Sequence, residues 1–173
     1  MESSTQRRRI LALWFPRLPT DRLRRLCGSA PEAASKDAPL VVAGRANTAL
    51  YVYALNKTAQ RLGLHRGQPL ANARAMVENL PVVPADEKAD LTLLESIADW
   101  CDRFTPLVAV DAPDGLLLDI SGVAHLFGGE AVMLQHVREK IAAQGFAVQA
   151  AIAGTSLAAR ALARYAAGTI APS

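Results

Sequence analysis

Short apolar runs that end at proline, glycine or polar residues recur along the chain and predict β-strands. The clearest, Ile-Leu-Ala-Leu-Trp-Phe at 10–15, is apolar at every position and is closed by Pro16, which indicates a buried strand. Similar runs lie at 40–43, 50–54, 107–111, 115–120 and 146–153, with a brief extended piece at 82–84. The turn Ala-Pro-Asp-Gly at 112–115 joins two of these runs into a hairpin.

Other segments repeat their apolar residues every three or four positions and predict helices. The longest spans about 86–104, where Leu91, Leu94, Ile97 and Cys101 share one face. Shorter helices are expected from Thr20 or Asp21 (either one as the cap) to Leu26, and at 56–62, 70–77, 130–144 and 156–165. Gly63 and Gly145 stand just beyond two of these ends, where a left-handed residue is common.

These elements predict an α+β fold in which paired strands form a sheet with helices on one side. The chain has 173 residues, 51% of them hydrophobic and 20% charged, enough for one sizeable domain or a core with a small satellite. Its apolar stretches are too short for a membrane-spanning helix, and Arg7-Arg8-Arg9 is not followed by a signal-peptide core. We therefore expect a cytoplasmic protein with no membrane partner.

The formal net charge is +3, and arginine dominates the basic residues. The planar guanidinium suits phosphate oxygens, so the composition permits a nucleic-acid partner. The alternative, that these arginines are solvated helix faces, stays open at this point.

Several common kinds of catalytic or metal site are missing from the sequence. There is no phosphate-binding GxxxxGK[ST] loop and no GxSxG, and the three histidines fall in separate elements. Cys27 and Cys101 suggest neither a disulfide nor a zinc site. Asp111, Asp114 and Asp119 bracket the hairpin, but the opening strand has no matching carboxylate, which favours Asp114 as a turn former.

Three segments, in order, resemble Y-family translesion DNA polymerases. Residues 56–73 are similar to the fingers segment, 114–122 to the palm motif that carries an Asp-Glu pair, and 151–160 to the later Gly-Ile-Ser-x-Asn-Lys stretch. The resemblance implies a polymerase palm, an antiparallel or mixed sheet backed by helices, at 1–28 and 81–173. It also implies a small helical fingers insertion at 29–80. The thumb, the little finger and the C-terminal tail of that family are expected to be absent from this chain.

The resemblance also implies that the chemistry of the family is lost. Trp14 stands where an active member has its first metal-binding aspartate, and Pro16 where a second usually follows. The Asp-Glu pair is Asp114-Gly115, which leaves Asp114 as a vestigial metal position. The triphosphate-binding positions are Lys57, Gln60 and Ser156 in place of tyrosine, arginine and lysine. We therefore expect no catalytic residue, no metal and no cofactor; Mg²⁺ belongs only to the alternative that the chain is an active polymerase.

The departures resemble those of the ImuB-type members of this family, accessory factors of bacterial damage-induced mutagenesis. That resemblance implies a non-catalytic hub in DNA repair and the SOS response, with a RecA-like partner, an error-prone replicative-type polymerase and the sliding clamp. DNA binding by this portion is expected to be weak, with candidates Arg61, Arg66, Gly67, Arg74 and Arg160. An active translesion polymerase with an unusual metal site, and a bare DNA-binding or structural fragment, stay as alternatives.

Overall fold

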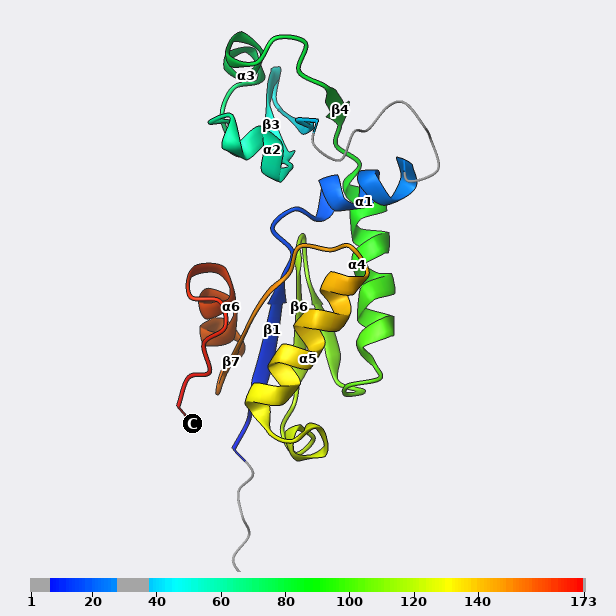
Figure 1. The fold of residues 1–173 in the computed structure, drawn as a ribbon, viewed down its shortest axis with the longest axis vertical. Coiled ribbons are helices and arrows are strands. Elements are labelled where there is room, and N and C mark those ends of the chain that lie inside the picture. Colours follow the sequence, from blue (N-terminus) through cyan, green and yellow to red (C-terminus); the bar gives the residue numbers. More distant parts are fainter. Residues whose placement is uncertain (1–6, 28–37, 173) are drawn as a thin grey trace, which may run out of the picture. The chain divides into compact units, whose positions relative to one another are not determined.

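The computed structural model describes residues 7–27 and 38–172. The chain divides into two compact units. The first unit joins Met1–Pro16 with Leu91–Ser173, and the second unit is Arg17–Asp90. Figure 1 shows the blue opening strand among the green to red elements of the first unit. Segments that are far apart in the sequence therefore form this unit together.

The first unit is built on a four-stranded sheet in the order β5-β6-β1-β7, in which every neighbouring pair is antiparallel. Its strands are β1 (Ile10–Trp14), β5 (Val108–Asp111), β6 (Gly115–Asp119) and β7 (Gln149–Ala153). The apolar opening run is therefore a central strand, as its buried pattern indicates. This confirms the predicted antiparallel sheet and its hairpin.

Helices cover both faces of this sheet. The helices of the unit are α4 (Glu87–Cys101, from Leu91 on), α5 (Glu130–Ala143), α6 (Ser156–Tyr165) and the short 3₁₀-helix η1 (Ala124–Phe127). Ile10 and Ala12 of β1 pack against Ala159 and Ala163 of α6. Leu11 and Leu13, which alternate with them, are buried on the other face, where α4 and α5 lie (Figure 1). The expectation of helices on one side was wrong. The spacing of apolar residues in a helix does not say which face of a sheet that helix covers.

A buried arginine fastens the two ends of this unit. Arg9 donates from Nε and Nη2 to Glu130 at 2.7 and 2.6 Å, and from Nη2 to the carbonyl of Ala171 at 2.9 Å. Its hydrogen bonds to Glu130 raise the pKa of the Arg9 guanidinium above its ordinary value. Arg9 therefore serves the fold, although its basic run pointed equally to a phosphate contact.

The second unit carries a smaller mixed sheet in the order β3-β2-β4, with β2 antiparallel to β3 and parallel to β4. Its elements are α1 (Leu18–Cys27), β2 (Val41–Ala46), β3 (Ala49–Leu55), α2 (Lys57–Arg61), α3 (Leu70–Met76) and β4 (Val82–Pro84). Asn56 caps α2 by accepting from the amide of Ala59, and Gly63 follows with φ +86°. Leu64 and Leu70 help to close the apolar core of this unit.

The division between units differs from the boundaries expected at 28/29 and 80/81. The structure divides the chain after Pro16 and after Asp90. The reason is packing, because β4 pairs with β2 and α1 contacts β2 and β3, which draws these elements into the second unit. The assignment of palm and fingers to particular residues stays a prediction.

Two local details also differ from expectation. Helix α1 begins at Leu18, so Thr20 and Asp21 lie inside its first turns and neither is its cap. Thr20 instead donates to the carbonyl of Arg17, and Asp21 pairs with Arg24. Among the helices of the described residues, none is both long and apolar enough to cross a bilayer.

Candidate functional site

The candidate site lies where β1 meets the β5-β6 hairpin in the first unit. Trp14, the last residue of β1, is opposite Gly115, the first residue of β6. The amide of Phe15 donates to the carbonyl of Asp114 at 2.8 Å, which continues the ladder past the strand end. The three positions singled out in the sequence, Trp14, Asp114 and Gly115, are therefore brought together.

The carboxylate of Asp114 is held by two donors from different elements. Trp14 Nε1 donates to Asp114 Oδ2 at 3.1 Å, and Arg164 Nη2 lies 3.0 Å from Asp114 Oδ1. The Arg164 guanidinium also lies over the Trp14 ring, 5.7 Å from its centroid. Asp114 is 7% exposed, so these contacts occur largely away from water, where a charged hydrogen bond is stronger than on an open surface.

A second carboxylate of the hairpin is paired in the same way. Arg160 Nε lies 2.8 Å from Asp111 Oδ2. Arg160 and Arg164 stand four residues apart on α6, so they occupy one face of that helix. Ala159 and Ala163, which precede them, are buried against the sheet and hold the helix close. One helix thus supplies an arginine to each of the two acidic residues at the turn of the hairpin.

The space beside Gly115 is closed. A Cβ added there would lie 3.1 Å from Asp111 Oδ2 and 3.2 Å from the carbonyl oxygen of Leu13. The shallow depression lined by Trp14, Asp111, Gly115, Arg160 and Arg164 has no room for a water molecule. A glutamate at this position would crowd the backbone and face the carboxylate of Asp111.

These residues do not fit the two magnesium ions that active members of the resembled family bind. Two ions need several converging carboxylate oxygens, and Mg²⁺ keeps near-octahedral oxygen coordination. Residues 7–27 and 38–172 contain no group of three or more His, Cys, Asp or Glu placed to bind a metal ion. The two carboxylates that are present already have arginine partners. No catalytic step through a metal follows from this site.

The residues at the expected triphosphate-binding positions are distributed over both units. Lys57 and Gln60 lie on the short helix α2 of the second unit. Ser156 is the first residue of α6 in the first unit, next to Thr155, whose hydroxyl caps that helix. That these three positions do not bind a nucleotide stays a prediction.

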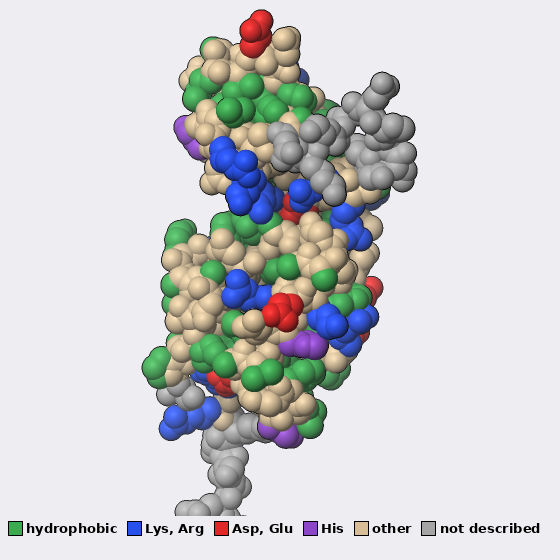
Figure 2. Space-filling view, in the orientation of Figure 1, with side chains coloured by type: hydrophobic (Ala, Val, Ile, Leu, Met, Phe, Trp, Pro, Cys, Tyr) green, Lys and Arg blue, Asp and Glu red, His purple; other side chains and the backbone are tan. Residues whose placement is uncertain are grey.

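The five candidate DNA contacts divide by their environment. Arg61, Gly67 and Arg74 are exposed in the second unit, where Figure 2 shows Lys and Arg side chains on the visible surface. Arg66 is exposed as well, but its Nε donates to the carbonyl of Tyr53 at 2.8 Å. Arg160 differs from the others because it belongs to the first unit and pairs with Asp111.

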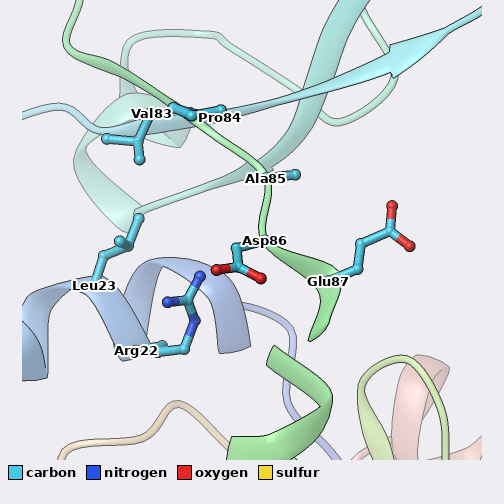
Figure 3. Close-up of a pocket in the computed structure, with 7 residues that line it drawn as sticks. All are labelled: Arg22, Leu23, Val83, Pro84, Ala85, Asp86 and Glu87. Atoms are coloured by element: carbon cyan, nitrogen blue, oxygen red, sulfur yellow. The ribbon is translucent and has the colours of Figure 1, made fainter. Parts of the chain in front are cut away.

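A pocket of about 590 Å³ lies in the second unit, between α1 and the segment that follows β4 (Figure 3). Arg22 and Asp86 point toward one another across it, whereas the carboxylate of Glu87 points away (Figure 3). Arg22 is held by Asp90, with Nε 2.6 Å from Oδ1. This pocket contains none of the positions that the resemblance singled out.

The sequence reasoning missed Arg164. Its signal was present, since Arg164 follows Arg160 by four residues in a helix whose limits were predicted correctly as 156–165. What the sequence lacked was the face of the sheet on which this helix packs. Without that face, neither arginine could be placed beside Asp111 or Asp114.

Comparisons with known proteins identify relatives of this chain. The chain is 49% identical over 104 residues to Protein ImuB of Caulobacter vibrioides, a match that covers 60% of this chain and 23% of that protein. It is 25% identical over 126 residues to DNA polymerase IV of Dehalococcoides mccartyi, covering 72% of this chain and 32% of the relative. The chain thus spans about a quarter to a third of the length of these curated relatives.

Solved structures show the same fold. An insertion ternary complex of Dbh DNA polymerase superimposes with a TM-score of 0.75 at 20% identity, covering 95% of this chain and 49% of that one. DinB from Sulfolobus solfataricus gives a TM-score of 0.67 at 19% identity, covering 94% and 47%. The sequence model of the impB/mucB/samB family matches residues 28–164. This match covers most of the chain, which therefore belongs to the impB/mucB/samB family and carries the UmuC-like domain of Y-family DNA polymerases.

Proposed function

We propose that this chain is part of a non-catalytic Y-family factor in DNA repair and damage-induced mutagenesis, one that brings an error-prone polymerase to damaged DNA. The observation that carries the proposal is the occupation of Asp114. Its two oxygens are engaged by Trp14 and Arg164, where an active polymerase needs them for metal ions. The likeness to Protein ImuB supports the same function.

The proposed partners are those that the resemblance to ImuB-type members implies. They are a RecA-like protein, an error-prone replicative-type polymerase and the sliding clamp, in addition to DNA. A scaffold needs the polymerase fold to recognise primed DNA, but it does not need the metal site. The preserved sheet with its altered site residues supports this separation.

Primer extension tests the loss of catalysis. The chain, with any downstream sequence that its gene encodes, is incubated with primed template, nucleotides and Mg²⁺ or Mn²⁺, beside the Dehalococcoides mccartyi polymerase IV as an active control. We expect extension by the control and none by this protein. Extension by this protein would establish the alternative, an active translesion polymerase with an unusual metal site.

Recruitment tests the scaffold role separately. Purified error-prone polymerase is applied to immobilised primed DNA that contains a lesion, with and without this protein. We expect this protein to increase the amount of polymerase retained and the extension past the lesion. Retention of this protein alone, with no gain in polymerase, would instead favour a bare DNA-binding fragment.

A further inference from the structure

The hairpin carboxylates of the first unit have cationic partners that the family resemblance does not assign. Asp111 is paired with Arg160 at 2.8 Å and Asp114 with Arg164 at 3.0 Å. The carboxylate groups are 15% and 11% exposed, and the arginines are 43% and 34% exposed. The acidic groups are thus largely withdrawn from water, while each arginine covers its partner from the solvent side.

Charge balance gives these pairs a definite consequence. Two neighbouring carboxylates on one hairpin repel each other unless cations compensate them. In a two-metal site the ions provide this compensation, whereas here two guanidinium groups from one helix do so. The indole N–H of Trp14 satisfies the remaining oxygen of Asp114, so the neutralised site is also hydrogen-bonded.

We infer that Arg160 and Arg164 replace the metal ions as structural counter-charges, so that Asp111 and Asp114 now fasten α6 to the β5-β6 hairpin and exclude metal. On this basis Asp114 has a structural role. Two results follow. Removing a carboxylate lowers stability, and restoring the lost carboxylates does not by itself restore metal binding. The inference rests on the geometry of the first unit and does not depend on the scaffold role.

A double-mutant cycle tests the structural half in the natural background. Asp114→Asn, Arg164→Met and the double variant are compared with the parent by thermal unfolding. We expect each single change to lower Tm by about 3–6 °C, and the double change to cost clearly less than the sum. Arg8→Met is the matched control, because Arg8 pairs with Asp119 at the other end of β6 while 70% exposed, and it should leave Tm nearly unchanged. Additive effects, or a higher Tm for Asp114→Asn, would overturn the inference.

Titration with Tb³⁺, a hard cation that prefers oxygen ligands, tests the exclusion of metal. Trp14→Asp/Gly115→Glu is compared with the same variant that also carries Arg160→Gln and Arg164→Gln, each checked for folding by circular dichroism. We expect saturable Tb³⁺ luminescence in the variant with four substitutions. The variant with only Trp14→Asp and Gly115→Glu should bind Tb³⁺ at least tenfold more weakly. Equal affinities, or no binding by a folded variant with four substitutions, would show that the arginines do not exclude the metal. If that variant does not fold, the double-mutant cycle tests the inference.

Discussion

Single residues determine the hydrogen bonding of the site beside the β5-β6 turn. Trp14 is a hydrogen-bond donor, so one oxygen of the Asp114 carboxylate accepts from an indole. That Trp14 stands where active members of the family have a metal-binding aspartate stays a prediction of the resemblance. The neighbours of Gly115, which the resemblance places at a second carboxylate position, leave little space for a larger residue. Arg160 and Arg164 pair with Asp111 and Asp114, so these four side chains carry no net charge.

Cys101 provides a prediction at this scale. It is fully buried on α4, and burial raises the pKa of its thiol to about 12. Since the thiolate is the reactive form, the folded protein should leave Cys101 almost unmodified at pH 8. Alkylation by iodoacetamide, followed by mass spectrometry in a Cys27→Ala variant, measures this.

Addition of urea above the unfolding transition should release rapid alkylation of Cys101. Rapid modification in the native state would contradict the buried position of the thiol.

At the scale of elements, one ion pair joins α1 to the beginning of α4 within the second unit. Arg22 contacts Asp90 at 2.6 Å, and their side chains are 12% and 4% exposed. Asp90 Oδ2 is buried without a hydrogen-bond partner among the described residues. Burial raises the pKa of Asp90, and the hydrogen bond from Arg22 lowers it in part. The pair is therefore held in a poorly solvated place, where loss of one partner is costly.

Arg22→Ala should destabilise the protein by about 3 kcal/mol at pH 7, because Asp90 is left charged and buried. The pKa of Asp90 then rises further, so the deficit should shrink as the pH falls through that raised value and the carboxyl group becomes protonated. Urea unfolding between pH 7 and pH 4 measures both effects.

Two comparisons make this measurement specific. Arg8→Ala removes the 70% exposed partner of Asp119, whose own side chain is 22% exposed, and should cost much less. In Arg22→Ala/Asp90→Asn the extra pH dependence should disappear. A deficit in Arg22→Ala that does not change with pH would argue against a buried charge at Asp90.

At the scale of the whole molecule, some arginines are paired with acidic side chains and others are not. Arg9, Arg160 and Arg164 are paired with acidic side chains of the first unit. Within the described residues, no ion pair joins Arg61 or Arg74 of the second unit to an acidic group, and both are exposed. The net charge of +3 therefore does not show which arginines are able to contact a phosphate backbone.

Arg61→Gln/Arg74→Gln should weaken binding to a primer-template duplex at low salt. Each lost phosphate contact reduces the slope of log K against log salt by about 1, so the double change should reduce it by about 2. Lys140→Gln/Arg138→Gln, on α5 of the first unit, removes the same charge and should alter the slope less. Fluorescence anisotropy at several salt concentrations makes the comparison, and equal slopes in both variants would refute a specific contribution of the second unit.

The sequence by itself determined most of the element types and the family. Helix 156–165 and the strands at 10–15 and 115–120 were predictable because their apolar residues follow a helix or strand pattern and their ends carry glycine, proline or a cap. The order of three motifs singles out Trp14 and Gly115, and their identification as lost metal positions stays a prediction. The spacing of apolar residues that distinguishes strands from helices is a local property, so the sequence alone contains it.

Only the tertiary structure decided which charges meet. Arg164 lies fifty residues from Asp114 in sequence, and nothing local relates them. Their contact depends on α6 packing on the face of the sheet opposite α4 and α5, and on the register that sets Trp14 against Gly115. The start of α1 and the division of the units were likewise decided by non-local packing, because helix limits and unit boundaries depend on what each segment contacts.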